Sequence, residues 1–111
     1  MSAFQPLYSI EDTEQFIAQH KLALLYITMP NCSVCHGLQP QIEQILTAYP
    51  LIQSRTIDAN KVTEIAGKLN IFTAPVLLLF VEGKEYIREA RIVHTDAFEQ
   101  KIARIYENMV D

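Results

Sequence analysis

Two cysteines, Cys32 and Cys35, stand two residues apart, and the chain of 111 residues has no others. Cysteines at this spacing either exchange a dithiol for a disulfide or help to bind a metal ion. A structural zinc site needs four ligands. The neighbourhood offers only these two thiols and His36, which would have difficulty pointing at the same ion as the adjacent Cys35. The spacing therefore favours thiol–disulfide exchange, with no metal ion expected.

The place of the pair between two expected elements gives each thiol a role. A continuous apolar run over residues 22–27 predicts a strand buried on both faces, and a helix is expected after Asn31. A thiolate at a helix N-terminus faces unpaired N–H groups and the positive end of the helix dipole, which lower its pKa. Cys32, nearer to the helix tip, is thus expected to attack a substrate disulfide, and Cys35 to displace the product. The reverse sequence would oxidise the substrate.

Helix and strand signals alternate along the rest of the chain. Helices are expected from Ser9, from the residues after Asn31 to Pro50 with a kink at Pro40, over residues 62–69, and from Thr95 or Asp96. Further strands are expected over residues 52–58, 76–81 and 85–93, with a turn at residues 82–84. This order predicts an α/β sandwich with helices on both faces of a sheet. Length and apolar content suit one domain over residues 1–111.

Charge and hydropathy argue against several classes of partner. The formal net charge is −4, and the nine Lys and Arg residues are scattered, so binding to a nucleic acid is not expected. The apolar runs are far shorter than the roughly 20 residues that a membrane-spanning helix needs, and residues 1–6 do not have the pattern of a secretory signal. We therefore expect a cytoplasmic protein without a membrane partner, and a monomer.

The order of these features resembles that of the thioredoxin family over nearly the whole chain. The shared features are the Cys-x-x-Cys pair, Pro40 eight positions after Cys32, Asp58 at a strand end, Thr73-Ala74-Pro75 running into the strand over residues 76–81, and Gly83 in the next turn. The resemblance implies a thioredoxin-like sandwich, in which a central mixed β-sheet of four to five strands is flanked by about four helices.

The resemblance also implies an activity and a set of site residues. The activity is that of a thiol–disulfide oxidoreductase in cell redox homeostasis and electron transport, with no cofactor. Its substrates would be protein or small-thiol disulfides, and a reductase or a low-molecular-weight thiol would donate electrons. Pro75 is expected to be cis beside the cysteines, with the backbone of Ala74 free to pair with a substrate. Substrate-binding positions are expected at Asn31, Ser33, Val34, Thr73, Ala74 and Pro75.

Several residues differ from the family's usual pattern. The family usually has Trp before the first cysteine and Gly-Pro between the cysteines, where this chain has Asn31 and Ser33-Val34. The redox potential of ordinary thioredoxin therefore cannot be transferred to this chain, and Asn31 is expected to cap the helix. A glycine usual before the last helix is missing from Val93-His94-Thr95, which predicts an altered choice of partner.

A further difference concerns the proton of the resolving thiol. A buried Asp is common in the family six residues before the first cysteine, where this chain has Tyr26. A phenol, with an ordinary pKa of about 10, is no general base near neutral pH. Tyr26 and His36 are therefore the candidates for tuning the thiol pKa, although His36 would equally suit a solvated helix surface.

Two other interpretations of the cysteine pair remain. Cys32 to His36 also matches the Cys-x-x-Cys-His signature of covalent haem attachment, but the chain lacks the mostly helical pattern of a cytochrome. The stronger alternative is a thioredoxin-like module for redox sensing or protein interaction with little turnover. The missing acid at Tyr26 favours that alternative, and the retention of both cysteines opposes it.

Overall fold

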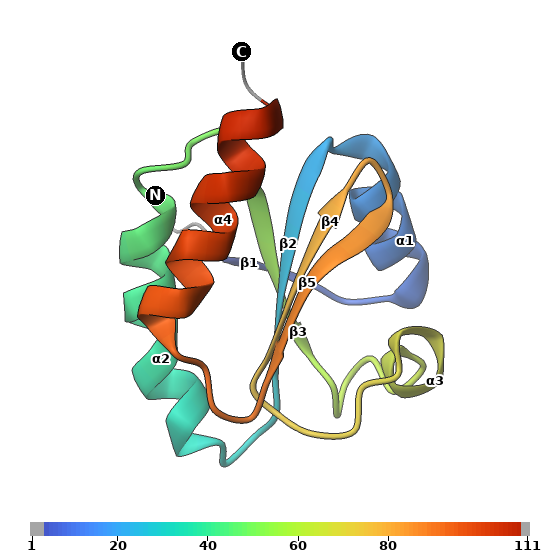
Figure 1. Ribbon diagram of the computed structural model, residues 1–111. Helices are drawn as coiled ribbons and strands as arrows, with labels where there is room; N and C mark the ends of the chain where they lie inside the picture. Colours follow the sequence, from blue (N-terminus) through green and yellow to red (C-terminus); the bar gives the residue numbers. More distant parts are fainter. Residues whose placement is uncertain (1–3, 110–111) are drawn as a thin grey trace.

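The computed structural model describes residues 4–109, and its elements follow one another as the sequence predicts, with one added strand (Figure 1). In chain order they are β1 (Gln5–Leu7), α1 (Ile10–Gln19), β2 (Leu22–Thr28), α2 (Ser33–Leu46), β3 (Gln53–Asp58), α3 (Ile65–Leu69), β4 (Val76–Val81), β5 (Lys84–Ala90) and α4 (Thr95–Met109).

The strands form one mixed sheet in the order β1-β3-β2-β4-β5. Strands β1, β3 and β2 are parallel, whereas β4 runs antiparallel to both β2 and β5. Helices α2 and α4 cover one face, and α1 and α3 cover the other (Figure 1). The five-stranded mixed sheet with four helices confirms the predicted α/β sandwich.

Strand β2 lies at the centre of the sheet and separates two apolar cores. Leu24 and Tyr26 belong to the core under α2 and α4, whereas Leu25 and Ile27 belong to the core under α1 and α3. All residues from Leu22 to Ile27 are buried, as the continuous apolar run predicts. The strand that leads to the cysteines is therefore held on both faces.

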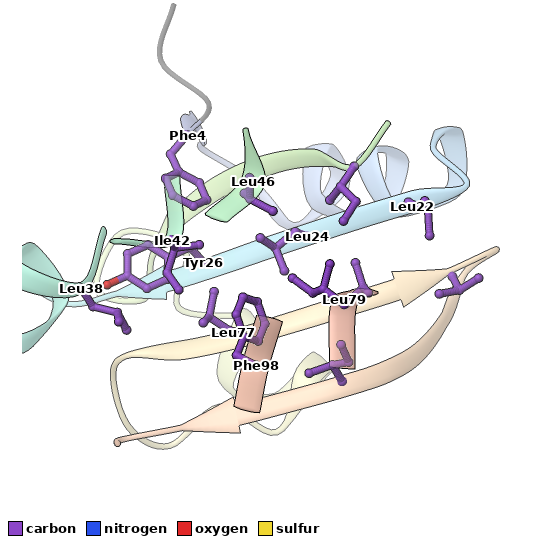
Figure 2. Packing of buried hydrophobic residues seen from close by; sticks show 14 of the residues in the cluster. Phe4, Leu22, Leu24, Tyr26, Leu38, Ile42, Leu46, Leu77, Leu79 and Phe98 are labelled. Carbon is purple, nitrogen blue, oxygen red and sulfur yellow. The ribbon is translucent and has the colours of Figure 1, made fainter. Parts of the chain in front are cut away.

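The core under α2 fixes the helix that carries the cysteines. Leu38 and Ile42 of α2 point toward Tyr26 of β2 and Leu77 of β4, and Phe98 of α4 closes the cluster (Figure 2). Burial of one such large apolar side chain contributes about 1.5–3 kcal/mol relative to its exposure. Cys35 belongs to the same cluster and Cys32 packs against it, so this packing also holds the helix turn that carries the cysteines.

Two turns have the geometry that their residues favour. Ser9 caps α1, because its Oγ accepts a hydrogen bond of 3.0 Å from the N–H of Asp12. The β4–β5 hairpin turns through Glu82 and Gly83, whose φ angles of 51° and 84° are those of a type I′ turn. The expected cap and turn are both confirmed.

The boundaries differ from the sequence prediction at a few places. β1 was not predicted, because three residues are too few for a strand pattern to be recognised. β5 ends at Ala90 rather than at residue 93, since Arg91 has a φ of 68° that interrupts the strand. α2 ends at Leu46, four residues before Pro50, and α3 begins only at Ile65. Within residues 4–109, no helix has both the length and the apolar character needed to cross a membrane.

Candidate active site

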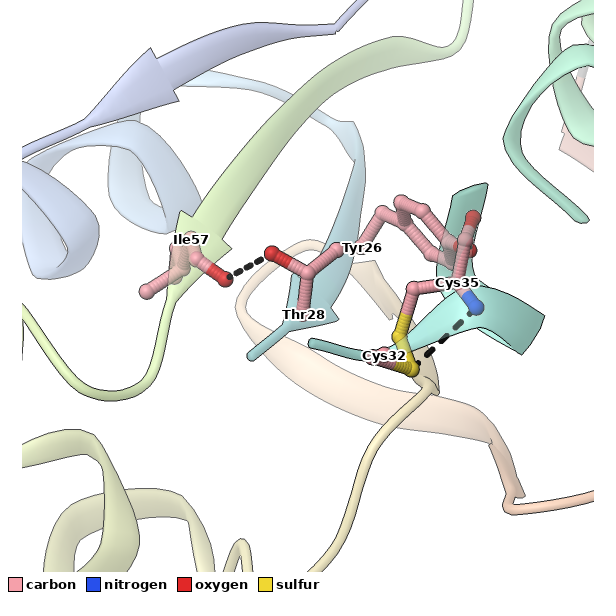
Figure 3. The surroundings of a disulfide bond; sticks show 5 residues. All are labelled: Tyr26, Thr28, Cys32, Cys35 and Ile57. Atoms are coloured by element: carbon pink, nitrogen blue, oxygen red, sulfur yellow. Dashed lines mark hydrogen bonds between the residues drawn. A yellow bond between two sulfur atoms is a disulfide. The ribbon is translucent and has the colours of Figure 1, made fainter. Parts of the chain in front are cut away.

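The two cysteines lie at the N-terminal end of α2 and form a disulfide (Figure 3). Cys32 is the N-cap residue of the helix and Cys35 lies in its first turn, with their Cα atoms 5.3 Å apart. Cys35 is only 1% exposed, whereas Cys32 is partly exposed. The sulfur of Cys32 is therefore the one that a second molecule can reach.

The sulfur of Cys32, rather than the side chain of Asn31, caps the helix. The N–H of Cys35 donates to Sγ of Cys32 at 3.2 Å, and Cys32 has the extended backbone that a cap residue requires. Asn31 has a φ of 63°, which places it before the cap in a left-handed conformation. The expectation that Asn31 caps α2 is wrong, and the backbone donor that it would have satisfied points at sulfur instead.

The end of β2 is tied to its neighbour just before the cysteine turn. Thr28 Oγ1 donates a hydrogen bond of 3.4 Å to the carbonyl of Ile57 in β3 (Figure 3). One residue further along β3, Asp58 Oδ1 accepts from the N–H of Asn60 at 2.8 Å and closes the following turn. These contacts fix the point from which the chain enters the segment leading to Cys32.

Tyr26 lies directly behind the helix turn that carries Cys35. Its side chain is fully buried, and its hydroxyl donates a hydrogen bond of 2.5 Å to the backbone carbonyl of Cys35 (Figure 3). Burial raises the pKa of the phenol to about 12. Tyr26 is therefore a neutral donor to the backbone near neutral pH, and its proton points at a carbonyl rather than at a thiol.

The segment before β4 brings the expected proline to the site. The Ala74–Pro75 peptide bond is cis, as the resemblance implies. Thr73 and Ala74 are partly buried, and Ala74 packs against the same core cluster as Cys32. Among the backbone hydrogen bonds of residues 4–109, none involves Ala74, whereas the carbonyl of Pro75 accepts from the N–H of Arg91 at 2.9 Å. The backbone of Ala74 is thus free to pair with another chain.

The remaining predicted residues lie on the outer surface of the cysteine turn. Asn31, Ser33 and Val34 are all exposed, and Val34 keeps 58% of its area open to solvent. His36 is also exposed, on the solvent side of α2. In the part of the chain that the structure describes, no three His, Cys, Asp or Glu side chains are grouped so that they could hold a metal ion.

Sequence reasoning missed two residues that stand beside this site, Arg91 and Ile92. The predicted strand continued to residue 93, and that assignment would have placed both in a regular strand. In the structure they form, with Val34 and other residues of α2, the wall of a recess next to the cysteines. The one sequence signal for an altered loop here is the missing glycine before α4. That signal does not predict the backbone conformation of Arg91 and Ile92.

Comparison with known proteins gives consistent matches in sequence and in structure. The thioredoxin family model matches residues 7–105. A thioredoxin-like protein of Bacillus subtilis, YdfQ, is 45% identical over 106 residues, which cover 96% of this chain and 95% of that protein. Thioredoxin-1 of Saccharomyces cerevisiae is 33% identical over 69 residues, 62% of this chain and 67% of that one. The crystal structure of thioredoxin from Trypanosoma brucei brucei superposes with a TM-score of 0.82 at 20% identity, covering 94% of this chain and 91% of that chain.

Proposed function

The chain belongs to the thioredoxin family of thiol–disulfide oxidoreductases, and we propose that Cys32 is its attacking thiol and Cys35 its resolving thiol. The observation that carries this assignment is the difference between the two sulfurs. Cys32 is partly exposed, and its Sγ accepts a hydrogen bond of 3.2 Å from the N–H of Cys35, whereas Cys35 is 1% exposed. In the reduced protein a backbone donor at this place favours the thiolate form of Cys32.

The exchange then proceeds in two displacements. The Cys32 thiolate attacks one sulfur of the substrate disulfide, a bond forms between these two sulfurs, and the other substrate sulfur leaves as a thiolate that takes up a proton. Cys35 next loses its proton and attacks Sγ of Cys32, which releases the second substrate thiol and forms the Cys32–Cys35 disulfide. The substrate gains two electrons and two protons, and the protein dithiol loses them.

The proton of Cys35 has no buried carboxylate to receive it at the position of Tyr26. The phenol there is already bonded to the Cys35 carbonyl, and its raised pKa of about 12 keeps it neutral. We therefore place this proton on the departing substrate thiolate or on solvent. His36, exposed one residue after Cys35, is the remaining titratable candidate for tuning the thiol.

The substrate segment would lie across the cysteine turn and the residues before β4. The unpaired backbone of Ala74 supports an extended pairing with the substrate chain, with Thr73 and the cis Pro75 on either side. Asn31, Ser33 and Val34 would contact the substrate from the outer surface of the turn. Because one sheet contains all the strands of residues 4–109, we also propose one domain over residues 1–111, and we propose that it acts as a monomer.

The partners follow from the chemistry of the family. Its members generally act on disulfide substrates and receive electrons from a reductase. For this chain we propose a protein or small-thiol disulfide as substrate, a reductase or a low-molecular-weight thiol as electron donor, and a cytoplasmic site of action, where a reducing environment would regenerate the dithiol.

Reduction of insulin disulfides, with dithiothreitol as electron source, tests the proposal. Wild type should accelerate the reaction, whereas Cys32→Ser and Cys35→Ser should not turn over. Cys35→Ser should accumulate a mixed disulfide on Cys32, and Cys32→Ser should accumulate none. If wild type is no faster than dithiothreitol alone, the protein is a sensor or an interaction module of narrow specificity. A mixed disulfide trapped on Cys35 would reverse the two roles.

A further inference from the structure

A recess of about 410 Å³ lies beside the cysteine turn, between α2 and the segment that joins β5 to α4. Figure 1 shows that segment running next to the N-terminal part of α2. Val34, the residue before Cys35, and Leu38 line the recess from α2, and Arg91 and Ile92 line it from the β5–α4 segment. A molecule bound through its sulfur to Cys32 would therefore have neighbouring atoms within reach of this recess.

The walls of the recess are largely apolar and open to solvent. Val34 and Ile92 are 58% and 73% exposed, and both line this one recess, so their apolar surfaces lie close to each other. The recess is also lined by Leu38, which is buried, and by Gly37, which adds no side chain. Apolar contact with a bound side chain would remove Val34 and Ile92 from water.

Arg91 is held at the edge of the recess by an unusual backbone conformation. Its φ of 68°, together with a hydrogen bond of 2.9 Å from the N–H of Ile92 to the carbonyl of Ala90, forms a three-residue γ-turn of the rare type. A residue with a Cβ adopts positive φ at a cost, and such residues cluster at binding sites. The N–H of Arg91 also donates to the carbonyl of Pro75, so the turn is fixed relative to the cis proline.

The guanidinium of Arg91 is the charged group of this recess, since the other lining side chains carry no formal charge. It makes no ion pair within residues 4–109, although the whole chain has a formal net charge of −4. The first turn of α2 contains no acidic residue either. A carboxylate that entered the recess would thus meet a cation not already neutralised, in the two-pronged geometry that arginine offers.

We infer that Arg91 sets a preference among substrates at this recess, which favours a segment of a protein disulfide in which an apolar side chain and a carboxylate lie next to the reacting cysteine. This inference rests on the proposed thiol–disulfide exchange and adds the chemistry by which the substrate is recognised. The apolar side chain contacts Val34 and Ile92, and the carboxylate pairs with Arg91. A carboxylate alone would occupy only a small part of about 410 Å³.

The test measures single-turnover reduction of three matched peptide disulfides by the fully reduced protein. Each peptide has leucine beside the reacting cysteine, followed by glutamate, glutamine or lysine. An exposed ion pair changes a rate by about two- to fivefold, so wild type should prefer the glutamate peptide over the glutamine peptide by that factor. Arg91→Gln should abolish the preference, and Arg91→Lys should retain part of it.

Two controls separate a local charge effect from other causes. Arg91→Gly keeps the γ-turn without strain and removes the cation, so it should lose the preference even if Arg91→Gln misfolds. Lys84→Gln removes one positive charge at the opposite end of β5 and should leave the preference unchanged. Moderate salt is used throughout, because the acidic chain repels acidic peptides at long range.

The possible outcomes distinguish the two levels of the proposal. If no peptide is reduced, the proposed exchange activity fails. If all three are reduced equally, or if the preference survives in Arg91→Gln, the exchange stands and the inference is overturned. Oxidised glutathione, an acidic disulfide without a large apolar side chain, is the last arm. If wild type reduces oxidised glutathione faster than the glutamate peptide, and Arg91→Gln loses this difference, the inference of a protein segment is overturned. The preferred substrate would then be a small acidic disulfide.

Discussion

Replacement of Tyr26 by phenylalanine should destabilise the protein without changing its reduction potential. The phenol hydroxyl donates to the buried carbonyl of Cys35, and Tyr26→Phe removes that donor while it keeps the ring and its contact with Phe4, whose centroid lies 5.3 Å away. Loss of one partner of a buried hydrogen bond costs about 1–3 kcal/mol. For a chain of 111 residues we expect a decrease in Tm of roughly 4–13 °C.

The potential should stay constant because the hydrogen bond ends on a backbone atom that both redox states possess. If the substitution weakens the oxidised and reduced forms equally, their difference in free energy is unchanged. A difference of about 1.4 kcal/mol between the two losses would instead shift the potential by about 30 mV. Thermal unfolding of both forms, together with equilibration against glutathione, measures the two quantities independently.

Tyr106→Phe is the matched control for this prediction. The hydroxyl of Tyr106 accepts a hydrogen bond of 3.3 Å from the N–H of Leu51 at an exposed site, so its loss should change the free energy of unfolding by no more than about 0.5 kcal/mol. If Tyr26→Phe lowers Tm no further than this control does, the buried hydrogen bond contributes nothing and our reasoning about the helix turn is refuted.

Three further substitutions test other parts of the fold. Phe98→Ala leaves a cavity at a fully buried site between α4 and the sheet and should lower the free energy of unfolding in urea by about 3–5 kcal/mol. A decrease below about 1 kcal/mol would contradict the packing described. Ser9→Ala removes the cap of α1 and should lower the free energy of unfolding by about 1 kcal/mol, whereas the control Ser9→Gly should change it by only a few tenths of that. The hydrogen bond from Arg88 lowers the pKa of Glu85 below its usual 4.5. The Glu85–Arg88 pair therefore stabilises the folded protein above the usual pKa of 4.5. This stabilisation is lost as the pH falls through the lowered pKa of Glu85 in the folded protein. Glu85→Gln should flatten this part of the pH profile of stability, and an unchanged profile would exclude the pair as its source.

Much of the fold could be predicted because its central elements have strong, simple patterns. The apolar runs of β2 and β4 are long enough to identify buried strands, and Ser9 and Gly83 mark a helix start and a turn through their own local chemistry. β1 has neither advantage. Its three residues pair with β3 alone, and such a short edge strand depends on the partner rather than on its own sequence.

The details of the site were harder to predict, because they depend on backbone geometry. The cysteine spacing indicates the chemistry, but residue preference predicts Asn31 as the cap of α2, because asparagine is a common cap residue. The structure assigns the cap to the sulfur of Cys32. The γ-turn at Arg91 is invisible to residue propensities, which disfavour positive φ at arginine. That conformation is maintained by a hydrogen bond to Pro75, a partner distant in sequence.

The differences from the family pattern fall on two separate steps of the proposed reaction. The backbone features used in exchange, the N–H aimed at Cys32 and the unpaired Ala74, do not depend on which side chains surround them. Arg91 would act on the approach of the substrate, before any bond is exchanged. Tyr26 is bonded to the backbone of Cys35, so we expect its substitution to act on the step in which Cys35 attacks. In the double variant, each displacement should therefore slow by the same factor as in the corresponding single variant.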